Sequence, residues 1–298
     1  MKILLTGITG FLGSHLASEL LRQKHQVIGL KRVSSKISRL KEFYDQILLI
    51  DIENGLNALF ETHPDINLII HVATSYGNEG ESVSNIVTAN VVMPLRLLEW
   101  SVRQDKCAFI NSDTFFCKAN DTYGHLSDYI STKRFFLQLA KAHAAENDAT
   151  FCNMQIEHMY GPSDGTQKFT MSIVQQLLDN KSEIMLTPGQ QIRDFIFVDD
   201  VVEAYLKVIA AIENNKLNGF KHFEVGAGVP YTVIDFVTMA HRITASKSAL
   251  LFGSLSYRES EIMHSQANLD ALNELGWYPK FELERGIGVL VESMRYSS

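Results

Sequence analysis

The feature that most constrains this chain is a glycine-rich turn at its N-terminus. An apolar run over residues 2–5 leads into Gly7, Gly10 and Gly13, and a helical pattern follows. Glycine permits positive φ and close approach of the backbone to a ligand, and the free N–H groups of a helix N-terminus favour an anion. The pattern predicts a strand, a turn and a helix that bind the pyrophosphate of a dinucleotide; a purely structural turn is the alternative. The expected contacts come from Gly7, Thr9, Gly10, Phe11, Leu12 and Gly13.

Further apolar runs predict the rest of a parallel sheet. Near-continuous apolar runs are typical of parallel strands that are covered by helices on both faces. We therefore expect an α/β fold, with a Rossmann-type doubly wound parallel sheet and a smaller C-terminal α+β lobe. Long helices are predicted from Asn90 to Arg103 and from Tyr129 to Ala145. The predicted strands span residues 26–30, 47–50, 68–74, 107–110 and 151–158.

Composition and charge exclude several other classes of protein. The 298 residues carry a net charge of −7, which disfavours nucleic acid as the main partner. No apolar run reaches the length of a membrane-spanning helix, so we expect a cytoplasmic protein without a membrane partner. Cys107, Cys117 and Cys152 favour reduced thiols over disulfides or zinc. No metal is expected, and we interpret Asp199 and Asp200 as caps of a helix N-terminus.

The end of the second predicted strand bears on the choice of cofactor. An acidic residue there would bind the ribose 2′-hydroxyl of NAD, but this chain has Lys31 and Arg32. These cations favour NADP, because a guanidinium pairs with a phosphate through two hydrogen bonds. Two solvated side chains on a loop are the alternative. The next strand ends at Asp51, whose carboxylate is predicted to lie near the adenine amino group.

A tyrosine and a lysine four residues apart are the candidates for chemistry. Tyr129 and Lys133 share one face of a predicted helix, and Ser112 follows a predicted strand. A nearby ammonium lowers the pKa of a phenol, so that Tyr129 can exchange a proton with a carbinol or ketone. Alone, this spacing often arises by chance. After a Rossmann half and a strand-end serine, it predicts a catalytic set in which Ser112 holds the same substrate oxygen.

Together these motifs resemble the extended short-chain dehydrogenases/reductases that act on nucleotide sugars. The resemblance rests on the glycine turn, on Ser112, Tyr129 and Lys133, and on residues 157–162, and it covers residues 1–278. Within that family the chain most resembles the CDP-abequose synthases, with the CDP-paratose synthases as close relatives. The closer resemblance lies in residues 109–116, 128–134 and 191–200.

This resemblance implies a reaction and a set of site residues. The reaction is NADPH-dependent reduction of the 4-keto group of CDP-4-dehydro-3,6-dideoxy-D-glucose, in the biosynthesis of O-antigen lipopolysaccharide sugars. Besides the glycine turn, the expected cofactor contacts are Lys31, Arg32, Asp51, Ile52, Val72, Ala73, Thr74, Asn90, Tyr129, Lys133 and Ile156. The expected substrate contacts are Tyr76, Ser112, Asp113, Thr114, His158, Lys168, Phe169, Arg193 and Arg258, with both arginines clamping the nucleotide diphosphate.

Departures from the wider family bear on the reaction type. In related 4,6-dehydratases the catalytic Ser or Thr is followed by Asp and Glu, whereas Asp113 and Thr114 follow Ser112 here. Loss of that glutamate argues against a dehydratase. Asp113 either contacts the sugar or caps a loop, and Lys168 either binds substrate or is solvated. The sequence favours neither alternative for Asp113 and neither for Lys168.

Other functions and the organisation of the chain stay open as hypotheses. A nucleotide-sugar epimerase would use the same Tyr129 and Lys133 but retain its cofactor, and a regulatory protein would bind NADP without needing a proton relay. A CDP-paratose synthase or another reductase of nucleotide-linked 4-keto-6-deoxyhexoses also fits. By family analogy we expect a homodimer through the two long helices. The predicted domains are an NADP-binding Rossmann domain over residues 1–160, with a returning segment over residues 190–222, and a nucleotide-sugar-binding remainder over 161–298.

Overall fold

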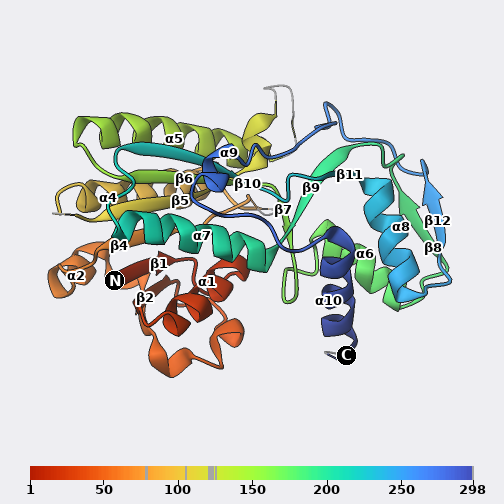
Figure 1. Ribbon diagram of the computed structural model, residues 1–298, viewed down its shortest axis with the longest axis horizontal. Helices are drawn as coiled ribbons and strands as arrows, with labels where there is room; N and C mark the ends of the chain where they lie inside the picture. Colours follow the sequence, from red (N-terminus) through yellow and green to blue (C-terminus); the bar gives the residue numbers. More distant parts are fainter. Residues whose placement is uncertain (78–79, 105, 120–123, 125, 297–298) are drawn as a thin grey trace. The chain divides into compact units, whose positions relative to one another are not determined.

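The chain divides into two units, which we call unit 1 and unit 2 (Figure 1). The computed structural model describes residues 1–77, 80–104, 106–119, 124 and 126–296. Unit 1 contains Met1–Cys117, Leu126–Gln155 and Tyr205–Phe223. Unit 2 contains Lys118–His125, Ile156–Ala204 and Glu224–Ser298. The chain therefore returns to unit 1 at Tyr205, later along the chain than the predicted start of the returning segment.

A seven-stranded sheet forms the centre of unit 1. Its strands have the order β10-β6-β5-β4-β1-β2-β3, and β1 pairs in parallel with both β2 and β4. The chain thus runs outward from β1 in two directions, and ligands of such sheets bind at the carboxyl ends of the strands where the direction changes. The strands are β1 (Lys2–Thr6), β2 (Gln26–Lys31), β3 (Leu48–Asp51), β4 (Leu68–His71), β5 (Ala108–Thr114), β6 (Phe151–Ile156) and β10 (Phe220–Val225).

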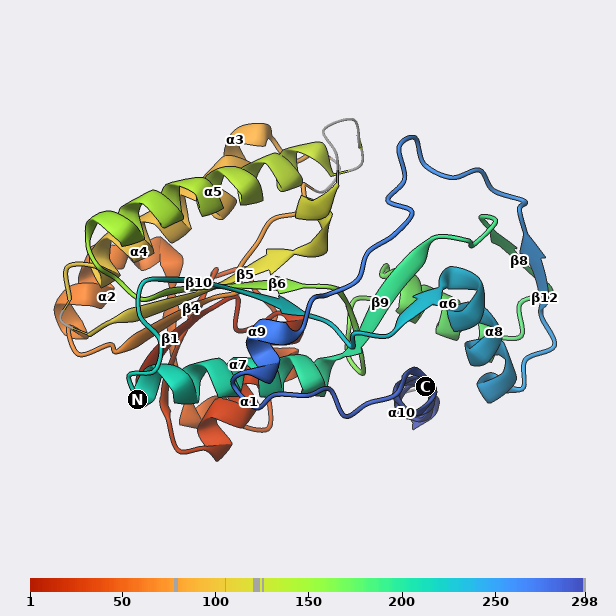
Figure 2. The ribbon, with the colours of Figure 1, turned by 45° about the horizontal axis from the view of Figure 1, so that its top comes forward.

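Helices cover both faces of this sheet (Figure 2). In that view α4 and α5 lie on one face, and α1 and the unit 1 part of α7 lie on the other. Unit 1 is thus a doubly wound α/β sheet, which confirms the predicted fold class. The helices are α1 (Phe11–Arg22), α2 (Leu56–Thr62), α3 (Val83–Val87), α4 (Met93–Ser101), α5 (Ser127–Glu146) and α7 (Val198–Glu213).

The helical segment before β5 differs from its prediction. It starts at Val83 instead of Asn90, and a π-helical turn, Thr88–Val92, joins α3 to α4. Pro94 lies in the first turn of α4 and has no N–H to give to the carbonyl four residues earlier. A wider turn at this point accommodates the missing hydrogen bond.

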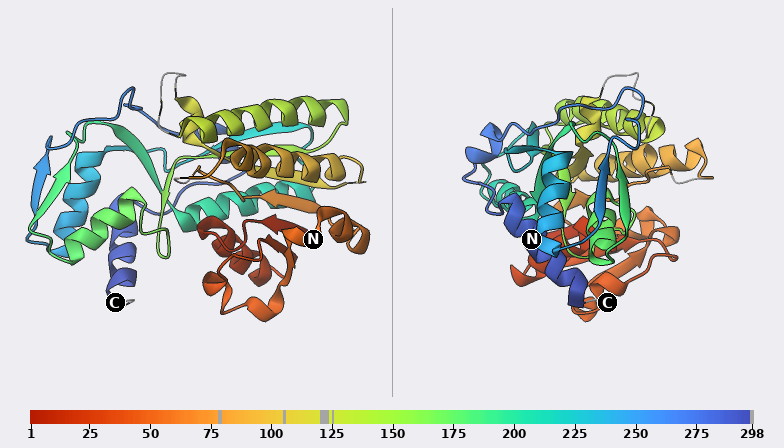
Figure 3. Two further views of the ribbon diagram at one scale, coloured as in Figure 1. Left: turned by 180° about the vertical axis from the view of Figure 1, so that it is seen from behind. Right: turned by 90° about the vertical axis from the view of Figure 1, so that its right-hand side faces the viewer.

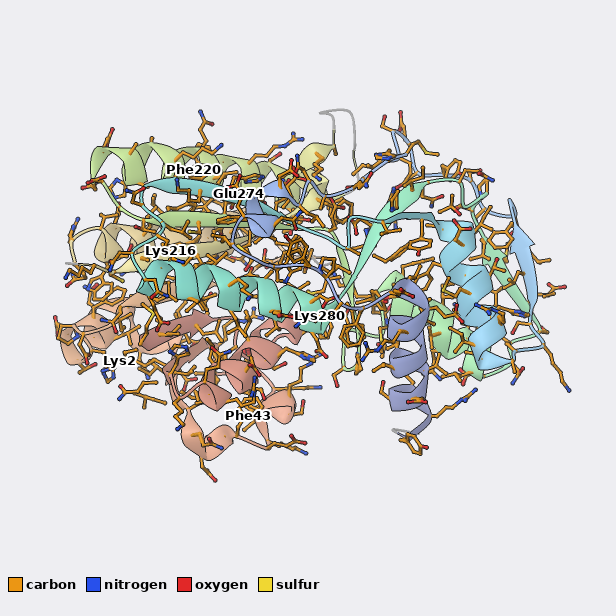
Figure 4. The ribbon with its side chains drawn as sticks, in the orientation of Figure 1. Lys2, Phe43, Lys216, Phe220, Glu274 and Lys280 are labelled. Carbon is orange, nitrogen blue, oxygen red and sulfur yellow. The ribbon has the colours of Figure 1, made fainter. Side chains whose placement is uncertain are left out.

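Aromatic side chains from β5, β6 and α5 pack in the core of unit 1. Phe109 and Phe151 are fully buried and stack with ring centroids 5.3 Å apart, and Phe136 packs beside them. At the edge strand β10, Phe220 stacks on Phe151, and the ammonium of Lys141 lies 4.7 Å from the Phe220 ring centroid (Figure 4). This core holds α5 against the strand that carries Ser112.

Unit 2 has two small sheets and a group of helices that pack against one another. One sheet has the order β11-β9-β7, and the other pairs β12 with β8 alongside α8 (Figure 3). The carboxylate of Asp194, fully buried on β9, accepts hydrogen bonds from the N–H groups of Ala227, Gly228 and Ala267. The elements are β7 (His158–Tyr160), α6 (Phe169–Leu178), β8 (Glu183–Leu186), β9 (Ile192–Phe197), β11 (Pro230–Thr232), α8 (Val233–Thr244), β12 (Ala249–Phe252), α9 (Asp270–Asn273) and α10 (Leu283–Tyr296).

The prediction that Asp200 caps a helix was wrong. Asp200 lies inside the first turn of α7, and its two carboxylate oxygens accept hydrogen bonds from the N–H groups of Lys280 and Phe281 at 3.0 and 2.9 Å. The ammonium of Lys280 also pairs with Glu203 of α7 at 2.6 Å (Figure 4). Asp200 therefore fastens the segment before α10 to the start of α7.

Candidate active site and cofactor site

The three glycines of the N-terminal turn have different structural roles. Gly7 has φ +66°, and a Cβ there would lie 2.7 Å from the N atom of Ala73. A Cβ on Gly13 would lie 2.1 Å from the carbonyl oxygen of Gly7, so α1 packs too closely on the turn for any other residue. A Cβ on Gly10 would meet that carbonyl alone, at 3.1 Å. The middle glycine thus leaves a backbone face open, as a dinucleotide pyrophosphate requires.

The start of α1 adds donors and positive potential to this open face. Gly10 is the N-cap and supplies no side-chain cap, and the first turn contains no acidic residue. The first-turn N–H groups, which include those of Phe11, Leu12 and Gly13, have no carbonyl partner within the helix. A helix N-terminus of this kind favours a phosphate. The residues present therefore fit a dinucleotide.

Thr6, a residue that we did not predict, sets the position of the chain after β4. Its Oγ1 accepts hydrogen bonds from the N–H groups of Val72 and Ala73, both at 3.1 Å, and lies 2.9 Å from Nδ1 of His71. These contacts end the strand at His71, three residues before the predicted end. Val72 and Ala73 are thereby held beside Gly7. The pKa of His71 is lowered by burial and by the charge of Lys133, so His71 is a neutral core residue.

Asn90, predicted to contact the cofactor, is occupied by protein partners. Its Oδ1 accepts from the N–H of Ser75 and from Thr74 Oγ1, at 2.7 and 3.1 Å. Its Nδ2 donates to the carbonyl of Ser75 and to Thr132 Oγ1, at 2.8 and 3.0 Å. These bonds use all four hydrogen-bonding positions of the amide. Asn90 therefore holds the segment after β4 against α5, and its contact with the cofactor stays a prediction.

The cations at the end of β2 are not equivalent. The ammonium of Lys31 forms an ion pair with the carboxylate of Asp51 at the end of β3, so the residues predicted for the phosphate and the adenine bind each other. Arg32 is exposed, and its backbone N–H bonds to Ser35 Oγ. Arg39, which the sequence analysis missed, donates from Nη1 to the carbonyl oxygen of Thr9 in the glycine turn at 3.3 Å. An arginine thus reaches the glycine turn from the largely exposed segment between β2 and β3.

Tyr129 lies at the start of α5 among other predicted site residues. Its side chain is 3% exposed, and its ring packs against that of Tyr76 with centroids 4.8 Å apart. Burial raises the pKa of Tyr129 well above 10, and a hydrogen bond with the Thr114 side chain opposes this shift. The predicted lowering was wrong in direction, because removal of the phenolate from water raises the pKa of Tyr129 and the nearby Tyr76, Asp113 and Cys117 raise it further. Tyr129 is therefore a protonated phenol.

The side chain of Lys133, which is on α5 as Tyr129 is, reaches the backbone of Ser112 on β5. The ammonium of Lys133 donates to the backbone carbonyl of Ser112 at 2.7 Å, and Lys133 is 4% exposed. Burial lowers the pKa of Lys133, while Asp113 raises it. Ser112 Oγ lies 2.6 Å from the hydroxyl of Tyr205 on α7, a residue that the sequence analysis did not identify. The structure thus brings Ser112, Tyr129 and Lys133 into one region of unit 1, with Tyr76 and Thr114.

Asp113 is anchored within the protein. One carboxylate oxygen accepts from the N–H of Thr114 at 2.8 Å and from Cys117 Sγ at 3.3 Å, and the other accepts from Asn153 Nδ2 at 3.0 Å. Asn153 in turn accepts from Asn111 at 2.7 Å. Asp113 therefore anchors the end of β5, and its contact with the sugar stays a prediction.

Unit 2 contains the residues predicted to hold the nucleotide diphosphate. Arg193, 5% exposed on β9, donates to the carboxylate of Glu261 at 2.6 Å and to the carbonyls of Ile192 and Ile262. Burial, followed by the charges of Arg193 and Lys168, lowers the pKa of His158 to about 3. Lys168 and Arg193 therefore lie close enough to His158 for their charges to act on its imidazole.

The remaining predicted residues of unit 2 are less constrained. The ring of Phe169, at the start of α6, packs on Phe236 with centroids 5.9 Å apart, and Lys168 precedes it as the N-cap residue. Arg258 is exposed in the segment after β12, and its carbonyl accepts the N–H of Glu261. Ile156 ends β6 and is buried.

A buried ion-pair cluster accounts for Glu157. One of its carboxylate oxygens accepts from Lys118 at 2.6 Å, and the other accepts from Ser265 at 2.6 Å. Lys118 also donates to Glu224 and to the carbonyl of Gln266. Glu157 therefore has a structural role, and Lys118 is a further residue that the sequence analysis missed.

The described residues contain neither a cluster of metal ligands nor a membrane-spanning helix. No group of three or more His, Cys, Asp or Glu side chains among them is placed to hold a metal ion. No helix among them is both long enough and apolar enough to cross a membrane.

Comparison with known proteins places this arrangement in a family. The profile of the NAD dependent epimerase/dehydratase family matches residues 3–226 of the 298-residue chain. The chain belongs to this family. It is 35% identical to CDP-abequose synthase of Salmonella typhimurium over 98% of each chain. It is 34% identical to CDP-abequose synthase of Salmonella muenchen over 96% of this chain and 95% of the other.

The family fold extends over the whole chain. UDP-glucose 4-epimerase of Thermotoga maritima, solved with UDP-glucose, superposes with a TM-score of 0.86 at 23% identity and covers 100% of this chain and 99% of the other. At this identity the likeness shows a shared fold. The resemblance to extended short-chain dehydrogenases/reductases that we inferred from sequence motifs is thereby confirmed.

Proposed function

We propose that this family member is an NADPH-dependent reductase of a nucleotide-linked 4-keto-deoxyhexose. The substrate would be CDP-4-dehydro-3,6-dideoxy-D-glucose and the product CDP-abequose. The observation that carries the proposal is the match to CDP-abequose synthase along 98% of both chains. The glycine turn supports the cofactor, because its open backbone face suits a pyrophosphate.

The chemistry assigned to the protein is proton donation to the substrate oxygen. A bound reduced nicotinamide supplies the hydride to the C4 carbon. Tyr129 gives its proton to the oxygen, and burial favours this direction because it keeps the phenol protonated. Ser112 orients the oxygen by a hydrogen bond. Lys133, a buried cation bonded to the carbonyl of Ser112, stabilises the negative charge that Tyr129 acquires.

The preference for NADPH is assigned to two arginines. Lys31 is neutralised by Asp51, which leaves it less able to select a 2′-phosphate. Arg32 follows β2, and Arg39 reaches the carbonyl of Thr9 in the glycine turn. We therefore assign recognition of the 2′-phosphate to Arg32 and Arg39, whose guanidinium groups suit a phosphate.

In unit 2, Arg193 and Arg258 are assigned to the nucleotide diphosphate, with His158, Lys168 and Phe169 beside them. Glu261 occupies one edge of the Arg193 guanidinium, so a phosphate would bind another edge or displace Glu261. Because the pKa of His158 is about 3, His158 would act as a neutral hydrogen-bonding group at neutral pH.

We also propose a homodimer through α4 and α5. Phe135 on α5 is 52% exposed, and Val92, directly before α4, is 45% exposed. Exposed apolar side chains of this size on neighbouring helices favour a protein interface. Replacement of Phe135 by Glu should therefore yield a monomer in sedimentation velocity. An unchanged sedimentation coefficient would contradict this interface.

One assay tests the reaction. Purified protein is mixed with NADPH and CDP-4-dehydro-3,6-dideoxy-D-glucose, and the absorbance of reduced nicotinamide is followed. Stoichiometric loss of NADPH supports the reductase, whereas turnover without net oxidation would indicate an epimerase. The C4 proton couplings of the product by NMR distinguish abequose from paratose.

A matched pair of variants tests the proton donor. Tyr129→Phe should lower kcat by about 10²–10⁴-fold, since general acid catalysis contributes that much. Tyr76→Phe keeps the neighbouring ring and should change kcat far less. If Tyr129→Phe retained full function in cells, a regulatory NADP-binding protein would be the better interpretation.

A further inference from the structure

Tyr205 makes a specific contact with Ser112 although 93 residues separate the two in sequence. The distance from Tyr205 Oη to Ser112 Oγ is 2.6 Å, at the short end of the range for a hydrogen bond between hydroxyl groups. Tyr205 is fully buried on the unit 1 part of α7, and Ser112 is 8% exposed on β5. The contact therefore joins the catalytic strand to a helix on the other face of the sheet.

The direction of this hydrogen bond follows from burial. Among the described residues, Ser112 Oγ is the one hydrogen-bond partner of the Tyr205 hydroxyl. A buried hydroxyl that does not donate its proton loses the free energy of a hydrogen bond to water. Burial also raises the pKa of Tyr205, so the proton stays on the phenol. Tyr205 is therefore the donor and Ser112 Oγ the acceptor.

This direction leaves the proton of Ser112 for another acceptor. A serine hydroxyl has one proton and two lone pairs. If Ser112 donated to Tyr205, it would have no proton for a substrate oxygen, and the Tyr205 proton would be unpaired. With Tyr205 as donor, one lone pair of the Ser112 hydroxyl is used and its proton is left for another acceptor. Lys133 holds the same residue by its backbone carbonyl at 2.7 Å, so Ser112 is restrained at both ends.

We infer that Tyr205 is a positioning residue, which by donating to Ser112 Oγ directs the serine proton toward the carbonyl oxygen of the substrate. This inference rests on the proposed reductase function. It concerns a residue that does not touch the substrate, and it predicts an effect on turnover that depends on Ser112.

A double-mutant cycle tests the inference. Ser112→Ala should lower kcat by about 10²–10³-fold, as removal of an oxyanion donor does. Tyr205→Phe keeps the buried ring and should lower kcat by about five- to tenfold, the effect of one hydrogen bond. KM for the nucleotide sugar and the dissociation constant of NADPH should stay within about twofold of wild type. In the Ser112→Ala background, Tyr205→Phe should have no further effect on kcat.

Tyr160→Phe is the matched control. Tyr160 is also a buried phenol, and it donates to the carbonyl of Leu283 in unit 2. Its replacement should lower the melting temperature without changing kcat. Equal effects of Tyr205→Phe on kcat with and without Ser112 would overturn the inference, as would no effect at all. A wild-type protein that does not oxidise NADPH would instead refute the proposed function, so the two failures are distinguishable.

Discussion

Lys133 in unit 1 and Arg193 in unit 2 are both buried cations with a neutral histidine nearby, yet their partners differ. Lys133 is 4% exposed and bonds to a backbone carbonyl, with the carboxylate of Asp113 engaged by other donors. Arg193 is 5% exposed and pairs directly with the carboxylate of Glu261. Burial lowers the pKa of both histidines; the charge of Lys133 lowers that of His71 further, and the charges of Arg193 and Lys168 lower that of His158 further.

This difference bears on the roles proposed for the two cations, which are assistance to Tyr129 for Lys133 and binding of the nucleotide diphosphate for Arg193. The charge of Arg193 is balanced by Glu261, so removal of either partner would leave an uncompensated buried charge. Among the described residues, no carboxylate contacts the ammonium of Lys133 directly, and burial lowers its pKa more than Asp113 raises it. Such an arrangement is costly for stability but keeps a positive field available to a neighbouring phenolate.

The strongest test of this comparison is the activity of Lys133→Met. Because the ammonium stabilises the charge that Tyr129 acquires, we expect kcat to fall by about 10²–10⁴-fold. Methionine is apolar and of similar length, so the free energy of unfolding should change by less than about 1 kcal/mol. Lys141→Met on the same helix is the control and should leave kcat unchanged. A large loss of stability in Lys133→Met would contradict a role in chemistry alone.

The corresponding substitution in unit 2 should act on stability. Arg193→Met leaves Glu261 buried without its partner, so we expect the free energy of unfolding to fall by about 3–5 kcal/mol in urea denaturation. Replacing both residues by Met should recover at least half of this loss, since the pair is then removed together. If the double variant were as unstable as the single one, the ion pair would not be the cause.

His158, beside Arg193, should make the free energy of unfolding depend on pH in acid. His158 has a folded pKa of about 3, below the value of 6.5 for the unfolded chain. Between these two pKa values, His158 binds a proton in the unfolded chain but not in the folded protein. The free energy of unfolding should therefore be highest above pH 6.5 and should fall as the pH falls. The loss should be about 1.4 kcal/mol per pH unit. His158→Gln should have a shallower decline between pH 6 and pH 5 in urea denaturation. Parallel curves would show that His158 is protonated in the folded state.

The cations after β2 should have the smallest effect, which is on the preference for NADPH over NADH. Lys31 is paired with Asp51 as Arg193 is with Glu261, whereas Arg39 bonds to a backbone carbonyl as Lys133 does. Arg32→Ala and Arg39→Ala should each lower the affinity for NADPH, relative to the affinity for NADH, by about tenfold in fluorescence titration. Lys31→Met should change this ratio by less than about threefold. A larger effect of Lys31→Met would show that Asp51 does not neutralise it.

Local patterns predicted more of the fold than of the site. The glycine turn, the apolar strands and the spacing of Tyr129 and Lys133 depend on residues that are close in sequence. The predicted direction of the Tyr129 pKa shift was wrong, because burial is a property of the packed core and is the largest cause of the shift. The sequence also did not show which protein donors and acceptors surround Asn90 and Asp113, because these come from distant segments.

The sequence by itself determined the class of sheet, the cofactor turn and the tyrosine–lysine face of α5, since strand and helix periodicities and glycine geometry act over a few residues. Only the tertiary structure decided that Tyr205 binds Ser112, that Glu261 neutralises Arg193 and that Asp51 neutralises Lys31. Each of these contacts joins segments that are distant in the chain. Their strength depends on burial, and burial is set by the packing of the whole unit.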